Sequence, residues 1–191
     1  MTLDAWLAAV LATPGLTALG DLAEARRALL EDSLRGVAVV ARYDGPIVDV
    51  GSGGGAPGIP LAAALPEREV TLLEASGRKC DFLERWAPPN ARVVWGRAEE
   101  QELDRYGVAV AKALASPPVA AEWCLPLVQP GGAVVLWLGP TADLDALARA
   151  SELLGGGRPE ERDGLVVLPK VAPTPPGFPR RAGMAKKRPL A

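Results

Sequence analysis

The chain is organised around Asp49-Val-Gly-Ser-Gly-Gly-Gly-Ala-Pro-Gly58, which follows the short apolar run Pro46-Ile-Val48 and precedes an Ala/Leu-rich segment at 59–65. This order predicts a strand, a glycine turn and a helix. The five glycines in this stretch give a backbone that can adopt positive φ and approach a ligand without a Cβ in the way. A turn of this kind that leads into a helix N-terminus is typical of nucleotide-binding sites.

The glycines alone do not say which nucleotide binds, because Gly53-x-Gly55-x-x-Gly58 also matches the dinucleotide fingerprint. Asp49 stands just before the first glycine. S-adenosylmethionine enzymes tend to carry an acidic residue there, since their ligand has no pyrophosphate to repel it. Glu74 ends the next apolar run, where an acidic residue binds ribose hydroxyls in both cofactor classes. The pattern favours S-adenosylmethionine and leaves a nicotinamide-dependent oxidoreductase as the enzyme alternative.

Composition places the chain among globular proteins. Its 191 residues, 49% of them hydrophobic, predict one domain with a substantial core. There is no histidine, and Cys80 and Cys124 lack metal-ligand spacing, so we expect no metal site and two buried thiols. No basic region followed by an apolar run opens the sequence, and no apolar segment approaches the ~18 residues that span a membrane. We therefore expect a cytoplasmic protein with no membrane partner.

Apolar runs rich in β-branched residues alternate with helical segments from residue 45 to 170, which predicts a doubly wound α/β domain with a mostly parallel, Rossmann-like sheet. We expect strands near 47–50, 69–74, 91–95, 107–113, 133–139 and 164–169, and helices near 58–65, 78–87, 117–128 and 141–154, with a short helix after Glu99. A polar interval before the last strand predicts an abbreviated far edge of the sheet. The carboxyl ends of parallel strands should bring Gly51, Glu74, Glu99 and Lys112 together.

The two ends of the chain differ in character. Residues 1–44 carry helical spacing at 4–12 and 22–42, which predicts a small cap that either sits on the sheet or covers the ligand site. Residues 171–191 form a basic tail that is too rich in proline to be helical and should be extended. From Lys170 onward there are six basic residues and no acidic one, which suggests a polyanionic partner. We expect all five tryptophans to pack in the core.

Several stretches, taken in order, resemble one family, the bacterial small-subunit ribosomal RNA guanine-7 methyltransferases called RsmG or glucose-inhibited division protein B. They are Asp49-Val-Gly-Ser-Gly-Gly-Gly-Ala-Pro-Gly-Ile-Pro-Leu61, Leu72-Leu-Glu-Ala-Ser-Gly-Arg-Lys79 with Phe82-Leu83, Gly96-Arg-Ala-Glu-Glu100, and Phe178-Pro-Arg-Arg-Ala-Gly183 with Lys187 and Pro189-Leu190. The resemblance implies a class I S-adenosylmethionine-dependent methyltransferase fold. It also implies small-subunit ribosomal RNA, or a 30S-type particle, as substrate; it implies no particular oligomer.

By this resemblance the cofactor contacts the glycine loop at Gly51 and Ala56. Its ribose lies at Glu74-Ala-Ser76, its adenine at Ala98-Glu99, and its methionine end near Lys112. With the residues argued above, the candidate cofactor-binding set is Asp49, Gly51, Gly53, Ala56, Glu74, Ala75, Ser76, Ala98, Glu99 and Lys112. The chain departs from the family at Lys112, where arginine is usual, and at Leu29 and Gly15. These departures keep open a divergent ribosome-binding module that retains the fold without turnover.

The implied reaction displaces a methyl group from a sulfonium by nitrogen 7 of a guanine, whose in-plane lone pair needs no deprotonation. Proximity and alignment, which can supply roughly 7–11 kcal/mol, then replace a general base. Among catalytic candidates we name Lys112 alone, as the group that places the methionine carboxylate or a substrate phosphate. The candidate RNA-binding residues are Arg180, Arg181, Lys186, Lys187 and Arg188, since each neutralised phosphate releases counterions.

Overall fold

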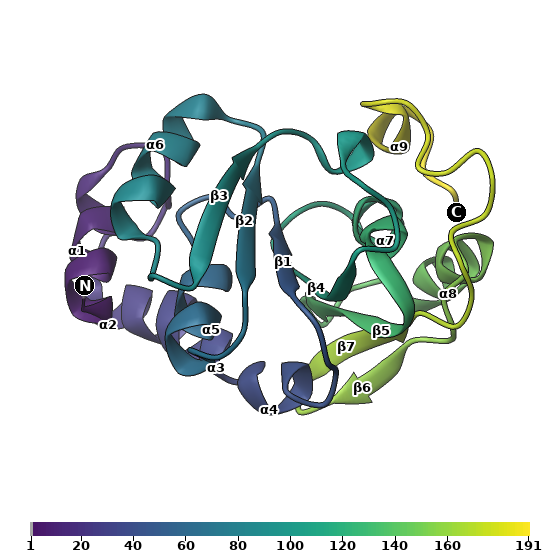
Figure 1. Cartoon of the computed structure of the whole chain (residues 1–191). Helices are drawn as coiled ribbons and strands as arrows, with labels where there is room; N and C mark the ends of the chain where they lie inside the picture. The colour runs from purple at the N-terminus through teal and green to yellow at the C-terminus, as the bar shows by residue number, and fades with distance from the viewer. Residues whose placement is uncertain (1) are drawn as a thin grey trace.

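The computed structural model describes residues 2–191 and is built on one seven-stranded sheet in the order β3-β2-β1-β4-β5-β7-β6 (Figure 1). The strands are β1 (Ile47–Val50), β2 (Val70–Glu74), β3 (Ala91–Trp95), β4 (Tyr106–Lys112), β5 (Val128–Trp137), β6 (Glu160–Arg162) and β7 (Leu165–Pro169). Strands β1 to β5 pair in parallel, whereas β7 runs antiparallel to β5 and to β6. The predicted doubly wound, mostly parallel sheet is confirmed.

The strand order reverses at β1, which pairs with β2 on one side and β4 on the other. In sheets of this type a crevice opens at the reversal, outside the carboxyl ends of the strands. The registers bring the ends of β1, β2 and β4 level with one another, since Val50 lies opposite Leu73 and Asp49 opposite Val110. The topology therefore places the glycine turn after β1 at the crevice.

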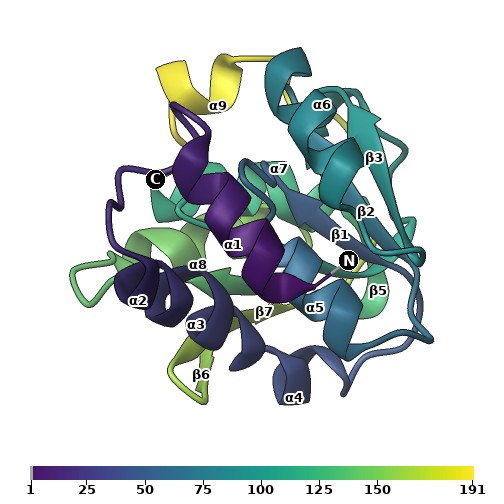
Figure 2. The same ribbon diagram turned by 90° about the vertical axis from the view of Figure 1, so that its left-hand side faces the viewer.

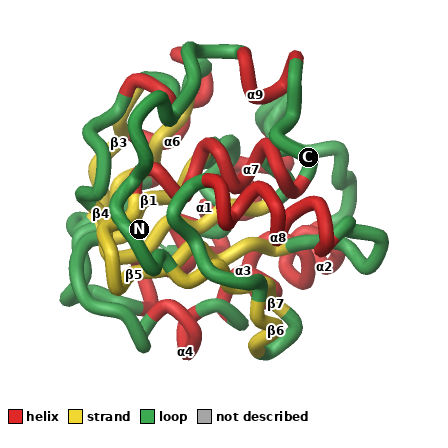
Figure 3. Tube along the Cα trace, turned by 90° about the vertical axis from the view of Figure 1, so that its right-hand side faces the viewer, coloured by secondary structure: helices red, strands yellow, loops and turns green. Residues whose placement is uncertain are grey.

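Helices cover both faces of the sheet. They are α1 (Leu3–Ala12), α2 (Leu22–Ala25), the π-helical turn η1 (Arg26–Glu31), α3 (Asp32–Leu34), α4 (Val37–Val40), α5 (Gly58–Ala64), α6 (Gly77–Trp86), the 3₁₀ turns η2 (Ala98–Glu100) and η3 (Leu125–Leu127), α7 (Pro117–Cys124), α8 (Leu144–Leu153) and α9 (Met184–Lys187). One core layer joins α1 to α6 with the sheet (Figure 2), and the other joins α7 and α8 with its opposite face (Figure 3). Within residues 2–191, no helix is long and apolar enough to cross a bilayer.

Local chemistry explains where the main helices begin. The side chain of Asp143 accepts a hydrogen bond from the Ala146 amide and caps α8, and Pro117 occupies the first position of α7, where its missing N–H costs nothing. Helix α6 places Cys80, Phe82 and Leu83 on its buried side. Both cysteines are buried as expected, and this burial raises the pKa of each thiol.

The structure corrects the predicted sheet edge. Strand β6, which the sequence analysis omitted, consists of three polar residues that pair with β7 through backbone hydrogen bonds. The turn between them is Asp163-Gly164, and both residues have positive φ, which matches a tight two-residue hairpin. An apolar-run search cannot detect this strand, because its side chains do not enter the core.

The C-terminal tail is not wholly extended, because Met184–Lys187 forms a helical turn, α9. Prolines exclude a helix up to Pro179 and again from Pro189, but the interval between them contains no proline and can form a helical turn. Lys170, which the sequence analysis counted with the basic tail, is fully buried; its ammonium donates to the carbonyl oxygens of Leu125 and Leu154. This buried lysine is part of the core rather than of a basic surface.

The five tryptophans differ in burial, and Trp86 and Trp123 are half-buried against the core. Trp6 and Trp137 are buried, as predicted, but Trp95 is 74% exposed, so the expectation of core packing is wrong for this residue. Trp95 is the last residue of β3, which is an edge strand with a neighbour on one side only. Its indole N–H donates to the Ala75 carbonyl at 3.1 Å and fixes the ring beside the turn that follows β2.

Candidate functional site

The glycine turn is supported from below by Asp49. This residue is 1% exposed; its Oδ2 accepts a hydrogen bond from the Gly58 amide at 3.0 Å, and its carbonyl accepts one from the Ser52 hydroxyl at 2.9 Å. Its other carboxylate oxygen has no hydrogen-bond partner in the described part of the chain. Burial raises the pKa of Asp49 to about 7, against the hydrogen bond that the Gly58 amide donates to its carboxylate, which lowers the pKa. Asp49 thus joins the two ends of the turn.

Gly51 shows why this turn needs glycine. Its φ is 72°, and a Cβ added there would lie 2.4 Å from Cδ1 of Leu114, in the segment after β4. Any side chain would therefore be strained in the backbone and would push the turn away from β4. The backbone can pass close to β4 because no Cβ intervenes.

Glu74 connects the glycine turn to the turn after β2. Its Oε2 accepts from the Gly53 amide at 2.9 Å, and its Oε1 accepts from the Ser76 amide at 2.8 Å. A carboxylate has about four lone-pair positions, so each oxygen can accept a further hydrogen bond. Glu74 lines a cavity of about 300 Å³ together with Gly51, Ala98 and Glu99, which we call the Glu74 cavity. It presents the paired acceptors that the two hydroxyls of a ribose require.

A second cavity, of about 220 Å³, lies over the glycine turn between Lys112 and the N-terminal cap; we call it the Lys112 cavity. The indole N–H of Trp6, in α1, donates to the Gly54 carbonyl at 2.8 Å. The ammonium of Lys112 donates to the Ala28 carbonyl at 2.6 Å and forms an ion pair with Asp32. The cap therefore does both of the things left open by its sequence: it packs on the sheet and covers the site.

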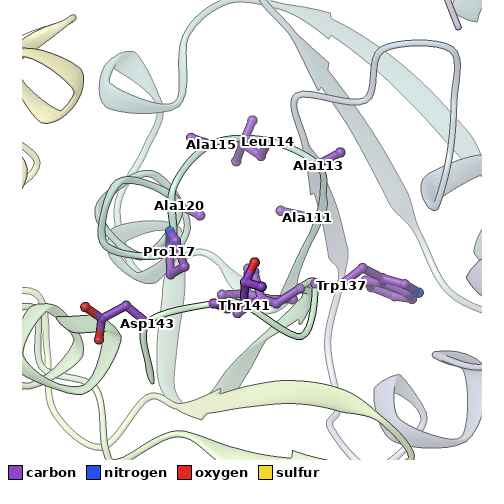
Figure 4. Close-up of a pocket in the computed structure, with 13 residues that line it drawn as sticks. Ala111, Ala113, Leu114, Ala115, Pro117, Ala120, Trp137, Thr141 and Asp143 are labelled. Carbon is purple, nitrogen blue, oxygen red and sulfur yellow. The ribbon is translucent and has the colours of Figure 1, made fainter. Parts of the chain in front are cut away.

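A third cavity, of about 390 Å³, opens beyond the ends of β4 and β5; we call it the Thr141 cavity. In Figure 4 the segment from Ala111 to Pro117 curves around it, and Thr141 lies across from Leu114. Ala113 lines all three cavities, so they adjoin one another along the carboxyl edge of the sheet. Small apolar side chains form most of the wall of the Thr141 cavity, which suits a flat ring.

The structure brings together most of the predicted cofactor residues. Those that line the Glu74 cavity are Gly51, Glu74, Ala75, Ala98 and Glu99, and those that line the Lys112 cavity are Gly51, Gly53, Ala56 and Lys112. The expected convergence of Gly51, Glu74, Glu99 and Lys112 is confirmed. Asp49 and Ser76 do not line either cavity. Asp49 accepts a hydrogen bond from the Gly58 amide and so supports the glycine turn, and the Ser76 amide donates one to Glu74, which lines the Glu74 cavity.

The C-terminal residues do not form a uniform basic surface. The guanidinium of Arg180 forms an ion pair with Glu122, which is 1% exposed, and its Nε lies 2.6 Å from Oε1 of that residue. Arg181, Lys187 and Arg188 are exposed. Lys186 lines the Glu74 cavity, although the sequence analysis assigned it to RNA; Trp123 lines the same cavity and also packs against the core, as expected. No signal within the sequence linked these two residues, because they are 63 positions apart.

The chain is similar to known proteins over most of its length. Residues 5–154 match the family model described as rRNA small subunit methyltransferase G. The chain is 38% identical to a Synechococcus protein named ribosomal RNA small subunit methyltransferase G, over 93% of this chain and 79% of that protein. It is 34% identical to the Moorella thermoacetica protein of the same name, over 92% and 82%.

Solved structures share the fold at low sequence identity. A TehB-like S-adenosylmethionine-dependent methyltransferase from Corynebacterium glutamicum superposes with a TM-score of 0.59 at 19% identity, covering 78% of this chain and 92% of that one. A T. thermophilus 16S rRNA methyltransferase, solved with S-adenosylmethionine and guanosine, gives a TM-score of 0.54 at 20% identity, covering 77% and 40%. At these identities the likeness extends to the α/β architecture alone.

Proposed function

This chain belongs to the rRNA small subunit methyltransferase G family, and on that premise we propose that it transfers a methyl group from S-adenosylmethionine to nitrogen 7 of a guanine in small-subunit ribosomal RNA. The observation that carries the proposal is the Glu74 cavity, with its glycine turn on one side and a buried carboxylate at the end of β2. That arrangement fits an adenosine whose ribose hydroxyls bond to Glu74.

The residues around the glycine turn divide the work of binding. Bound there, S-adenosylmethionine supplies an electrophilic methyl group on its sulfonium. Glu74 holds the ribose, and the backbone lies against the ligand at Gly51 and Gly53, which have no side chains. The ammonium of Lys112 has three N–H donors, and two of them bond to the Ala28 carbonyl and to Asp32. The third donates to the methionine carboxylate in the Lys112 cavity.

The guanine enters the Thr141 cavity, because that cavity adjoins the other two at Ala113 and is lined by small apolar side chains. Nitrogen 7 carries a lone pair in the ring plane, so the chain needs no general base and contributes alignment. The base must leave its stack to reach this position, which favours unpaired or loosely stacked RNA. Lys112 acts as a positioning group and takes no proton.

Exposed basic and aromatic side chains surround the same edge of the sheet and contact the RNA. They are Arg78, Trp95, Arg97, Arg181, Lys187 and Arg188. Lysine and arginine neutralise phosphates and make the affinity depend on salt. An exposed indole such as Trp95 offers a face on which an unpaired base stacks.

The test is transfer of labelled methyl from S-adenosylmethionine to small-subunit ribosomal RNA, offered both naked and as particles, with mapping of the modified base. We expect label on nitrogen 7 of one guanine, and a loss of about tenfold or more in cofactor affinity in Glu74→Gln, whose amide offers one acceptor oxygen where the carboxylate has two. RNA binding without transfer would support the ribosome-binding module instead. Binding of a nicotinamide dinucleotide in place of S-adenosylmethionine would contradict the proposal.

A further inference from the structure

We propose that the C-terminal segment Arg180–Arg188 is a wall of the cofactor site, and that Lys186 binds the adenine base of S-adenosylmethionine rather than RNA. The inference rests on the proposed function, since it takes S-adenosylmethionine as the ligand of the Glu74 cavity. It separates Lys186 from Lys187, which carries the same charge in the same helical turn, and from Arg188, which follows that turn. Figure 1 shows α9 above α7, across the carboxyl edge of the sheet.

The segment is attached to the domain by a partly buried ion pair. Arg180 donates through both Nε and a terminal nitrogen to the two carboxylate oxygens of Glu122, in the last turn of α7. The same terminal nitrogen donates to the carbonyl of Arg188 at 2.8 Å. One guanidinium therefore closes the segment into a loop and fixes both its ends to α7. A free RNA-binding tail has no need of such an attachment.

A second attachment joins the segment directly to the lining of the cavity. The amide of Gly183 donates to Oε1 of Glu99 at 3.1 Å, and Glu99 belongs to the turn η2 at the edge of the Glu74 cavity. Gly183 has a φ of 80°, which turns its amide toward Glu99 and begins α9. This contact places α9 beside the cavity, with Ala185 buried and Lys186 and Lys187 exposed to solvent. It also occupies one of the two Glu99 oxygens that the sequence analysis assigned to adenine.

Lys186 is held at the cavity by an aromatic ring. Its ammonium lies 5.3 Å from the centroid of the Trp123 ring, within the range of a cation–π contact, and both side chains line the Glu74 cavity. The ring orients the ammonium but accepts no conventional hydrogen bond, so the protons on its other sides are available to a ligand. Lys187 does not line any of the three cavities described above.

The position of Lys186 selects the adenine half of the ligand. Glu74 takes the ribose, and Lys112 lies in the neighbouring cavity at the methionine end. Lys186, Ala98 and Glu99 line the part of the Glu74 cavity that comes from η2 and the C-terminal segment. The ring nitrogens of adenine are hydrogen-bond acceptors, and an ammonium is a pure donor. Lys186 therefore donates to a ring nitrogen of adenine while Trp123 supports it.

The experiment measures the affinity of the full-length chain for S-adenosylhomocysteine by calorimetry, in wild type, Lys186→Ala and the matched control Lys187→Ala. We expect Lys186→Ala to raise the dissociation constant about tenfold, as for one lost charge-assisted hydrogen bond, and Lys187→Ala to leave it within about twofold. Lys186→Met, which keeps an apolar contact with Trp123 but donates no proton, should weaken binding as much as Lys186→Ala. Adenosine alone should show the same loss as S-adenosylhomocysteine.

Three results would overturn the inference. They are an unchanged dissociation constant in both Lys186 variants, an equal loss in Lys187→Ala, which would indicate a general effect of charge, and a loss for S-adenosylhomocysteine that adenosine does not share. Thermal unfolding of each variant, compared with wild type, identifies any that fails to fold, and Lys186→Met then replaces Lys186→Ala. If the wild-type chain itself does not bind S-adenosylhomocysteine, the proposed function fails rather than this inference.

Discussion

The two ends of the chain close the same site from different sides and by different physical means. At the N-terminus, α1 covers the glycine turn through Trp6, which is fully buried and bonded to Gly54. At the C-terminus, the segment Arg180–Arg188 reaches the Glu74 cavity through an ion pair with Glu122 and a cation–π contact with Trp123. The N-terminal cap is thus held by apolar burial, whereas the C-terminal wall is held by charge.

Because of this difference, we expect the N-terminal cap to contribute mainly to folding stability and the C-terminal wall to respond to salt and ligands. Burial of apolar surface is not weakened by ionic screening, so the N-terminal cap should behave as part of the folded core. Charged contacts near the surface contribute less to folding and respond to salt and to bound ligands. The C-terminal wall is therefore the end of the chain that a cofactor or RNA can reposition. Each of the following four experiments tests this contrast.

The largest effect is expected at Trp6. Trp6→Ala removes a fully buried indole and its hydrogen bond to Gly54, and should lower the free energy of unfolding by about 3–5 kcal/mol. Urea denaturation followed by circular dichroism measures this. Trp95→Ala is the matched control, because the same residue type at 74% exposure should cost no more than about 0.5 kcal/mol. Equal losses at the two positions would contradict the burial argument.

The second effect is a dependence of the free energy of unfolding on pH, which comes from Asp49. This residue lies beneath the glycine turn, between the N-terminal cap and the C-terminal wall. Burial raises its folded-state pKa to about 7, from a value near 3.8 when it is unfolded. Between these values the folded protein retains a proton that the unfolded chain has released, so this group's contribution to stability falls as pH rises. The slope is about 1.4 kcal/mol per pH unit, and it levels off above pH 7.

Asp49→Asn should remove this slope, because an amide does not titrate and can still accept the hydrogen bond from Gly58. Urea denaturation of both proteins at several values between about pH 5 and 8 measures the difference between them. We expect that difference to shift in favour of the variant by about 2–3 kcal/mol between pH 5 and 7. Other titrating groups cancel in the comparison. Parallel stability curves would show that Asp49 is ionised in the folded protein.

The third effect concerns the ion pair that attaches the C-terminal wall. Arg180→Ala leaves the carboxylate of Glu122 buried without its partner and should destabilise the fold by about 1–3 kcal/mol. Arg181→Ala, the exposed neighbour, should change stability by less than about 0.5 kcal/mol. The measurement is chemical denaturation, with the double variant Arg180→Ala/Glu122→Gln as a test of the pairing. If the double variant were no more stable than Arg180→Ala, the loss would not come from the unpaired carboxylate.

The smallest effect is expected at Lys187, an exposed residue of the C-terminal wall. Lys187→Ala should weaken RNA binding a few-fold without altering stability, and should reduce the slope of log K against log salt concentration by about 0.7–0.9. Fluorescence anisotropy with a small-subunit RNA fragment at several salt concentrations measures both quantities. Lys186→Ala is the comparison, since Lys186 should affect the cofactor instead. An unchanged salt slope in Lys187→Ala would remove Lys187 from the RNA surface.

Much of the fold followed from local pattern. The runs that became β1 and β3 were predicted with their observed bounds, because glycine or proline signals flank each run on both sides. Strand β6 and helix α9 were missed for a shared reason: both are short and polar, and each forms only because a neighbouring segment supplies backbone or side-chain partners. Propensity within such a segment is too weak to identify it.

The candidate site divides in the same way. The positions of Gly51, Glu74, Ala98 and Glu99 were predictable, because each follows a parallel strand and strand ends meet at one edge. Asp49 was predicted to belong to the cofactor site, but its position in that site was not predicted. It supports the glycine turn through a hydrogen bond from Gly58 instead of facing the cavity. The hydrogen bond that decides this depends on the position of a helix amide, which the order of residues does not reveal.

The sequence by itself determined the α/β architecture, the family and the cofactor edge, because periodicity, glycine spacing and strand-end residues are local properties. Only the tertiary structure decided that Arg180 pairs with Glu122 and that Lys186 meets Trp123, since these contacts join residues 58 and 63 positions apart. In the sequence the six C-terminal cations are equivalent charges. Burial and partner then assign Lys170 to the core, Arg180 to an ion pair and Lys187 to solvent, because the electrostatic role of a charge depends on what surrounds it.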